Sequence, residues 1–179
     1  MEAPVLLVGL AAGVAFGQLG YTHCCIEDVA IISSIPGIDI YSPIDPSLIK
    51  DLVLEIQQNN KPTYLRLTGE PNLLPVPLSN KIDTESFCYQ IATGSDIILI
   101  TTGSITSFAY EAYKMLPEEI RDLVGMYSIC KIKPLRLDFI LEELSVAKKI
   151  LVIEEGVING FYAEFVVNYP QLAHKSKPL

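Results

Sequence analysis

Short apolar runs that alternate with segments of helical spacing constrain the fold of this chain most. The first run, Val5–Val8, is continuous, which predicts a strand buried on both faces of a sheet. A turn at Gly20–Asp28 then leads into a predicted helix over residues 26–34, which Pro36 and Gly37 end. Ligands gather at the carboxyl ends of strands in open α/β sheets, so we expect His23, in this turn, to face such a crevice.

The same alternation continues along the rest of the chain. Helices are predicted at residues 46–58, 104–116, 137–147 and 160–169, and further strands at 38–41, 63–67, 87–92, 97–100, 124–129 and 150–153. Strands that alternate with helices predict an α/β fold of mostly parallel sheets covered by helices.

A stretch rich in proline divides this pattern. Pro71, Pro75 and Pro77 lie between Thr68 and Asp83, where they cannot maintain a helix and leave gaps in any ladder. We therefore predict a partial domain at residues 1–70, a linker at 71–83 and a second domain at 84–179.

Composition argues against several classes of function. The formal net charge of -8 argues against a nucleic-acid partner, which would require a basic face. Each apolar run is shorter than the roughly 18 residues of a membrane helix, and Met1-Glu2-Ala3 lacks the basic start of a signal peptide, so we expect a cytoplasmic chain without a membrane partner. The four cysteines lack zinc-site spacing, and the vicinal Cys24 and Cys25 are predicted to be small buried residues and not a redox pair.

Several short motifs then follow one another in a fixed order. They are Gly20-Tyr21-Thr22-His23, Ile26–Ala30, Ile35–Gly37, Pro43–Pro46, Lys61–Leu67, Thr101–Ser104, Lys133–Leu135 and Val152–Gly156. In this order they resemble the transketolase family of thiamine-diphosphate enzymes, over about residues 4–167. The motifs before residue 70 resemble the later half of the pyrimidine-binding domain, and those after residue 100 resemble the C-terminal domain.

The resemblance implies an enzyme that moves a two-carbon ketol unit between sugar phosphates, with thiamine diphosphate and Mg²⁺ as cofactors. The family histidine at the position of His23 faces the reactive thiazolium carbon, which makes His23 the candidate catalytic residue, a donor or proton shuttle at a developing oxyanion. Arg66 occupies the position of the arginine that binds the terminal phosphate of the sugar, a task that suits a bidentate donor. By position alone, Arg66 could equally be paired with a carboxylate.

The carboxylates near these motifs are given structural roles. Glu27 and Asp28 lie in the first turn of the helix after His23, where negative charge favours the helix dipole. Glu154 and Glu155 resemble the Glu-Glu turn of the family and are expected to serve domain packing or a subunit interface.

Two departures from the family concern the donor sugar. Typical transketolases carry an aspartate four residues before the histidine, where this chain has Leu19. They also carry a second histidine twelve residues before it, where this chain has Ala11. Both lost groups contact donor hydroxyls in the family, so we expect a donor other than xylulose 5-phosphate, or the same donor recognised differently.

A larger departure concerns the cofactor. The family's activating glutamate and the aromatic residue that stacks on the aminopyrimidine would lie upstream of Val5, and the diphosphate- and magnesium-binding domain has no counterpart here. We therefore expect a segment of a larger transketolase-like protein, inactive and without bound cofactor when alone, whose partner is the missing N-terminal half or subunit. Its substrate would be a sugar phosphate.

An incomplete first sheet also predicts self-association. An unpaired strand and an uncovered apolar face near Val5–Leu10 are a liability in a monomer, so we expect a homodimer.

Other functions remain open on the sequence. They are the beta subunit of a 2-oxoacid dehydrogenase, a deoxyxylulose phosphate synthase, and a non-catalytic assembly module. Thr22 before His23, and the Tyr64-Leu65-Arg66 strand, favour transketolase over the dehydrogenase subunit.

Overall fold

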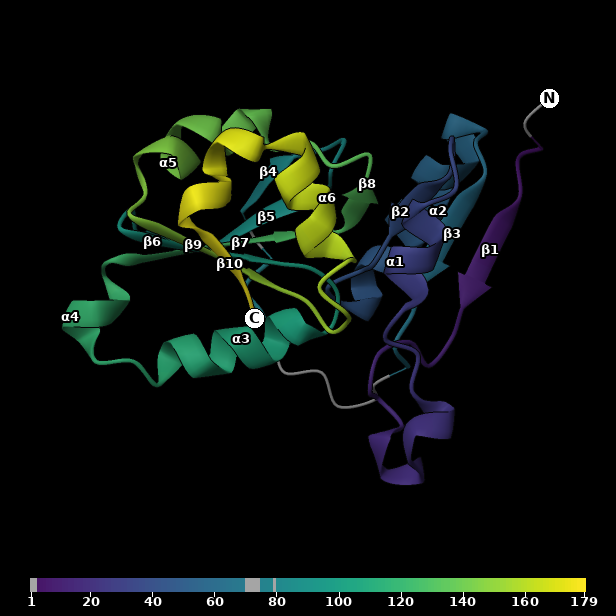
Figure 1. Cartoon of the computed structure of the whole chain (residues 1–179), viewed down its shortest axis with the longest axis horizontal. Coiled ribbons are helices and arrows are strands. Elements are labelled where there is room, and N and C mark those ends of the chain that lie inside the picture. The colour runs from purple at the N-terminus through teal and green to yellow at the C-terminus, as the bar shows by residue number, and fades with distance from the viewer. Residues whose placement is uncertain (1–2, 70–74, 79) are drawn as a thin grey trace.

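The computed structural model describes residues 3–69, 75–78 and 80–179, and their strands form two sheets (Figure 1). The first sheet has four strands in the order β1-β3-β2-β8. Their bounds are β1 (Leu6–Gly9), β2 (Asp39–Tyr41), β3 (Thr63–Arg66) and β8 (Lys131–Lys133). Strands β1 and β2 both run parallel to β3, whereas β8 is antiparallel to β2.

The second sheet has six strands in the order β10-β9-β6-β7-β5-β4. Their bounds are β4 (Lys81–Asp83), β5 (Cys88–Ala92), β6 (Ile97–Thr101), β7 (Val124–Ile129), β9 (Lys149–Ile153) and β10 (Ser176–Pro178). The four strands from β10 to β7 are parallel, and β5 and β4 form an antiparallel edge. The predicted α/β fold with mostly parallel sheets is confirmed.

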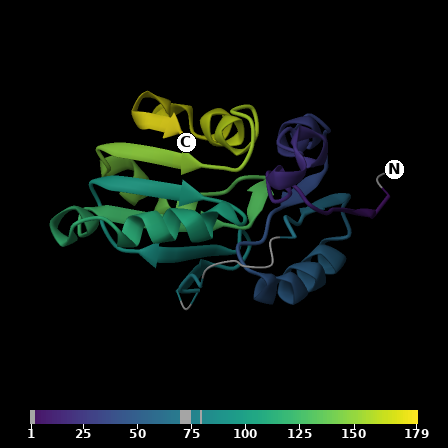
Figure 2. The same cartoon turned by 90° about the horizontal axis from the view of Figure 1, so that it is seen from below.

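Helices cover both sheets. The helices are α1 (Asp28–Ser33), α2 (Ile49–Asn59), α3 (Ile105–Lys114), α4 (Glu118–Arg121), α5 (Leu141–Val146) and α6 (Phe161–Asn168). Helix α3 lies on one face of the six-stranded sheet, and α5 and α6 lie on the other (Figures 1 and 2). Asp45 caps the turn before α2, because its Oδ1 accepts a hydrogen bond from the Ser47 backbone N at 2.8 Å.

Successive side chains along β2 and β3 point to opposite faces of the first sheet, and both faces are apolar. Each face packs in a hydrophobic cluster that also includes residues of the second sheet. Ile40 and Tyr64 pack with Val29 of α1, in a cluster that also holds Phe161 of α6. The intervening residues, exemplified by Leu65, pack in a second cluster with α2. Helices α1 and α2 therefore cover opposite faces of the first sheet, and both cores cross from one sheet to the other.

Strand β1 is the part of the first sheet that these helices leave uncovered. The exposed fractions are 49% for Leu7 and 45% for Val8 in the strand, and 57% for Val5 just before it. The prediction that Val5–Val8 is buried on both faces is wrong, because the strand lies at the sheet edge and the helices pack over β2 and β3. The uncovered apolar face expected near Val5–Leu10 is present.

Several elements escaped the sequence patterns. Strands β4, β8 and β10 are each three residues long, and α4 has four residues. Strand β4 lies inside the predicted 71–83 linker, where residues 71–74 and 79 are outside the described residues. The division of the chain at this linker stays a prediction, although β8 of the later segment pairs with β2 of the earlier one.

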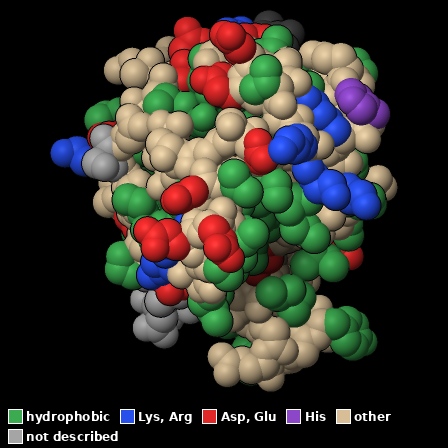
Figure 3. All heavy atoms as spheres, turned by 90° about the vertical axis from the view of Figure 1, so that its left-hand side faces the viewer, with side chains coloured by type: hydrophobic (Ala, Val, Ile, Leu, Met, Phe, Trp, Pro, Cys, Tyr) green, Lys and Arg blue, Asp and Glu red, His purple; other side chains and the backbone are tan. Residues whose placement is uncertain are grey.

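The face of the molecule that carries α4 has both acidic and basic side chains on its surface. Acidic side chains spread over its upper and left parts, and Lys and Arg side chains gather at its right (Figure 3). Among the helices that the structure describes, none has the length and apolar character needed to cross a membrane.

The cysteines are all free, and their burial differs from the prediction. Cys25 is exposed and Cys24 half-buried, so the expectation that this pair is buried is wrong. The pair lies at the end of the loop before α1, outside both cores, whereas Cys88 and Cys130 are buried in them.

Candidate functional site

His23 lies in a loop, residues 11–25, that leads from β1 to α1 and protrudes from the first sheet (Figure 1). Two backbone hydrogen bonds close the base of this loop, from Gly13 N to Cys25 O at 2.7 Å and from Cys25 N to Gly13 O at 3.0 Å. His23 ends a 3₁₀ turn at the tip and is exposed, with its Nδ1 3.0 Å from the Thr22 hydroxyl. The imidazole is therefore accessible to a group outside this chain.

Arg66, at the carboxyl end of β3, is only 4% exposed and forms a buried ion pair. Its Nε donates to Asp28 Oδ2 at 2.9 Å, and the Tyr64 hydroxyl donates to the same oxygen at 2.8 Å. Burial and the neighbouring Asp28 raise the pKa of Tyr64 well above its usual value, so its hydroxyl remains a donor. The other Asp28 oxygen, Oδ1, is buried without a hydrogen-bond partner in the described chain.

Asp28 therefore does more than favour the dipole of α1. It is buried at the first position of that helix and fixes the helix to β3 across 38 residues of sequence. Because a buried carboxylate is costly unless it is paired, Arg66 and Tyr64 are needed to keep it there.

Glu155 extends this network to the second sheet. The Arg66 Nη2 donates to the Glu155 backbone O at 2.8 Å. The Glu155 carboxylate accepts from the Val14 backbone N at 2.6 Å and from the Ser104 hydroxyl at 3.0 Å. Glu155 alone thus contacts the His23 loop, the end of β3 and the start of α3.

Gly13 is required where the loop meets Glu155. Its φ is +73°, and a Cβ added there would lie 2.4 Å from the Glu155 Cδ. A side chain would therefore strain the backbone and displace the carboxylate.

Glu154, the other half of the acidic pair, caps α6. Its carboxylate accepts from the backbone N of Phe161 at 2.7 Å and of Tyr162 at 2.9 Å. Burial raises the pKa of Glu154, although these two hydrogen bonds oppose that shift. Both glutamates thus make packing contacts.

The structure does not bring His23 and Arg66 into direct contact. Across residues 3–69, 75–78 and 80–179, no hydrogen bond or ion pair joins the two side chains. Asp28 and Glu155 are the partners of Arg66 that local patterns could not reveal, since they lie 38 and 89 residues from it.

A pocket does lie beyond the carboxyl ends of the first strands, but it is small and mostly apolar. Its volume is about 160 Å³, and it is lined by Leu10, Pro43, Asp45, Pro46, Ile49, Leu67, Thr68 and Gly69. Drug-sized ligands generally occupy pockets of about 300–1,000 Å³. In the described part of the chain, moreover, no group of three or more His, Cys, Asp or Glu could hold a metal ion. These residues on their own do not fit thiamine diphosphate or Mg²⁺.

Two family models match this chain. The model "Transketolase, pyrimidine binding domain" matches residues 1–72, and "Transketolase, C-terminal domain" matches residues 88–177.

Individual relatives agree with these matches. The chain is 30% identical over 167 residues to a subunit of apulose-4-phosphate transketolase from Phocaeicola vulgatus, covering 91% of this chain and 52% of that protein. It is 29% identical to a 1-deoxy-D-xylulose-5-phosphate synthase of Lawsonia intracellularis, covering 93% of this chain and 26% of that protein. The chain thus spans about half or less of the length of these relatives.

Solved structures share the fold. A split-gene transketolase described as an inactive beta4 tetramer superposes with a TM-score of 0.75 at 23% identity, covering 93% of this chain and 53% of that one. A transketolase from Campylobacter jejuni superposes with a TM-score of 0.71 at 14% identity, covering 97% of this chain and 26% of that one. With the pyrimidine-binding and C-terminal domain matches in that order, the chain belongs to the transketolase family.

Proposed function

We propose that this chain is part of a thiamine-diphosphate-dependent transketolase that moves a two-carbon ketol unit between sugar phosphates. The observation that carries the proposal is the pair of domain matches, in family order, in a chain that covers 52% of a relative named as a transketolase subunit. Thiamine diphosphate, when bound, supplies the carbanion chemistry, while the protein supplies orientation and electrostatics.

The proposal needs a second polypeptide segment. Among the residues that the structure describes, no group of His, Cys, Asp or Glu fits Mg²⁺, and the pocket at the strand ends is small. We therefore assign the diphosphate- and magnesium-binding half to a partner. His23, exposed on a protruding loop, would then contribute an N–H donor or a proton shuttle to a site completed by that partner.

For Arg66, the contacts support a role different from the one implied by the family. A phosphate anchor must be accessible, and Arg66 is buried against Asp28 and Glu155. We propose that the main role of Arg66 is to position the His23 loop, and that any contact with a substrate phosphate is additional to this role.

Kinetics of the assembled enzyme can separate these roles. Replacing His23 by Ala should mainly lower kcat, by about a hundredfold, if one positioned acid or donor is lost. Replacing Arg66 by Ala should lower activity equally on phosphorylated and unphosphorylated donors if Arg66 positions the loop. A higher KM confined to phosphorylated donors would instead establish the phosphate role.

The donor sugar is proposed to differ from xylulose 5-phosphate. Leu19 and Ala11 replace residues that contact donor hydroxyls in typical transketolases. Among the relatives, two are named for apulose 4-phosphate and one for 6-deoxy-6-sulfo-D-fructose, which supports testing those donors beside xylulose 5-phosphate.

A second candidate is 1-deoxy-D-xylulose-5-phosphate synthesis. It is favoured by relatives of that name that align with 92–93% of this chain. The two candidates differ in their products, so both must be assayed.

The decisive experiment is co-expression of this chain with a candidate diphosphate-binding half from the same genome. With thiamine diphosphate and Mg²⁺ added, we expect ketol transfer by the pair and none by either polypeptide alone. The pair carrying His23→Ala is the matched control. Turnover by the pure chain, or formation of 1-deoxy-D-xylulose 5-phosphate without ketol transfer, would contradict the proposal.

Self-association is the remaining part of the proposal. Within the described part of the chain, strand β1 presents an unpaired edge whose apolar side chains are about half exposed. A second copy of this chain would cover that edge, and we propose a homodimer formed there.

A further inference from the structure

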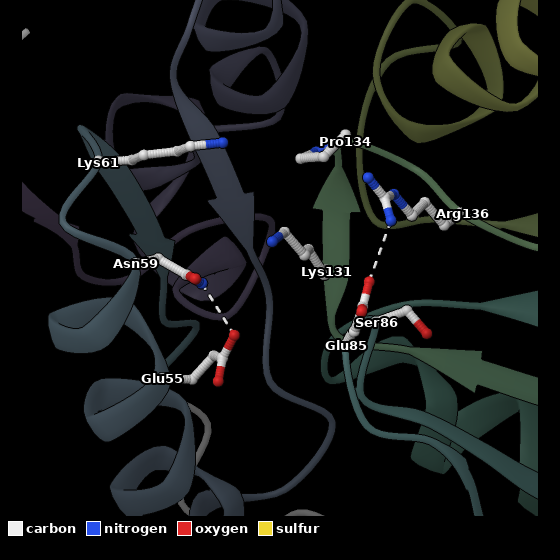
Figure 4. Close-up of a pocket in the computed structure, with 8 residues that line it drawn as sticks. All are labelled: Glu55, Asn59, Lys61, Glu85, Ser86, Lys131, Pro134 and Arg136. Atoms are coloured by element: carbon white, nitrogen blue, oxygen red, sulfur yellow. Dashed lines mark hydrogen bonds and ion pairs between the residues drawn. The ribbon is translucent and has the colours of Figure 1, made fainter.

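A cleft lies near the amino ends of β2 and β3, at the other end of β3 from Arg66. Its volume is about 350 Å³, within the range of small-ligand pockets. The residues that line it are Glu55, Asn59, Lys61, Glu85, Ser86, Lys131, Pro134 and Arg136 (Figure 4). All but the proline are polar or charged, which favours a polar ligand.

Three cations from separate segments meet in this cleft. Lys61 precedes β3, Lys131 lies in β8, and Arg136 follows β8. The ammonium groups of Lys61 and Lys131 point into the gap from opposite sides (Figure 4). The lining holds three cations and two carboxylates, and Asp39 beside Lys131 is a third carboxylate, so the cleft is about neutral although the whole chain has a net charge of -8.

Lys131 is the fixed member of the three. Its Nζ lies 3.1 Å from Asp39 Oδ2 and 5.1 Å from the centre of the Tyr41 ring, and its side chain is 13% exposed. Burial alone would lower the pKa of Lys131, but Tyr41 and Asp39 outweigh that effect and raise it. The ammonium therefore stays charged at the floor of the cleft.

Lys61 and Arg136 are the adaptable members. Arg136 Nη1 donates to Glu85 Oε2 at 3.0 Å, and both side chains are mostly exposed, so this pair is held weakly. Lys61 has no ion pair within the described part of the chain. An arginine fork and lysine ammonium groups are suitable donors to a phosphate.

We propose that this cleft binds the phosphate group of a small phosphorylated metabolite. Lys131 supplies the fixed charge, and Lys61 and Arg136 close on the phosphate from either side. Lys61 lies between α2 and β3, in the part of the chain that builds the first sheet. Arg136 follows β8, which comes directly after β7 of the second sheet along the chain, so a bound ligand would contact both parts of the chain. The proposal does not depend on ketol transfer.

Isothermal titration of the whole chain tests this site. The probes are inorganic phosphate, ribose 5-phosphate and ribose. Binding of both phosphates with no binding of ribose is expected. Equal affinity for the two phosphates would show that the cleft contacts the phosphate group alone, and tighter binding of ribose 5-phosphate would show that it also contacts the sugar.

Variants of the cleft and of a remote surface pair provide the controls. Lys61→Ala and Arg136→Ala should each weaken binding about tenfold, as expected for loss of a charge-assisted hydrogen bond. Lys148→Ala, which removes an exposed cation paired with Asp96, should leave binding unchanged. Circular dichroism would establish that each variant is folded.

Several results would overturn the proposal. They are no binding of either phosphate at about 10 mM, equal binding of ribose, unchanged affinity in both cleft variants, or equal weakening by Lys148→Ala. The last result would mean that the phosphate responds only to overall charge.

Discussion

The two sheets of this protein differ in how far their own chain covers them. The six-stranded sheet has helices on both faces, and its central β6 is buried over its last four residues. The four-stranded sheet is covered over β2 and β3, but its edge strand β1 leaves apolar side chains about half exposed. Similar apolar sequences thus have different surroundings in the two sheets, and the difference indicates where another polypeptide can add to this one.

The network at the junction of the sheets should give the largest effect on stability. Replacing Arg66 by Ala leaves Asp28 buried and unpaired, and should lower the free energy of unfolding by about 3–5 kcal/mol. Lys148→Ala breaks an exposed pair and should cost about 1 kcal/mol or less. Urea denaturation of both variants would check this contrast, and similar losses would mean that the Arg66 pair is not the junction described here.

Two matched leucine substitutions compare the sheets directly. Leu144, in α5 over the six-stranded sheet, has an exposed fraction of 0%, and Leu144→Ala should cost about 2–5 kcal/mol. Leu7→Ala in β1 removes a side chain that is 49% exposed, and should cost about 1 kcal/mol or less. Urea unfolding at a concentration low enough to keep the chain monomeric would measure both, and a Leu7 loss as large as that of Leu144 would contradict the exposed edge.

Cysteine labelling gives the smallest effect, a difference in rate without loss of fold. Burial raises the pKa of Cys130 to about 12 and also raises that of Cys88, so neither should react with iodoacetamide in the native protein. Cys25 is exposed and should react, although partial burial and the charges of Asp28 and Glu27 raise its pKa.

The raised pKa of Cys25 predicts how its labelling rate depends on pH. A raised pKa keeps the Cys25 thiol protonated at neutral pH, so its labelling should be slower than that of free cysteine and should accelerate above pH 9, the ordinary value. Peptide mass mapping across pH would measure the rates. Labelling of Cys88 as fast as that of Cys25 would show that the core shared with α1 and α6 opens readily.

The sequence predicted the elements whose patterns are local. Strand β6 and helix α2 carry long apolar patterns and were placed within one to three residues of their observed bounds. Strand β8 escaped, because Lys131-Ile132-Lys133 is too short to give a pattern and is defined by pairing with β2. The prediction that β1 is buried was wrong. An apolar run shows that a strand can be buried, but not whether other parts of the chain pack over it.

At the candidate site, too, the sequence predicted what depends on a local motif and missed what depends on long-range contacts. His23 was found from its motif, and the structure places it on an exposed loop. The partners of Arg66 could not be read from the sequence, because Asp28 resembles an ordinary first-turn carboxylate and Glu155 lies 89 residues away. Residues that act through long-range contacts need the fold before their role is visible.

The native mass of the chain tests the central contrast most directly. Light scattering at micromolar concentration should give a dimer for the wild type, because a second copy covers β1. Leu7→Lys places a charge on that edge and should give the mass of a single chain, while Lys148→Ala should remain a dimer. A monomeric wild type, or a Leu7→Lys variant that still dimerises, would contradict the proposal that β1 is the surface another copy covers.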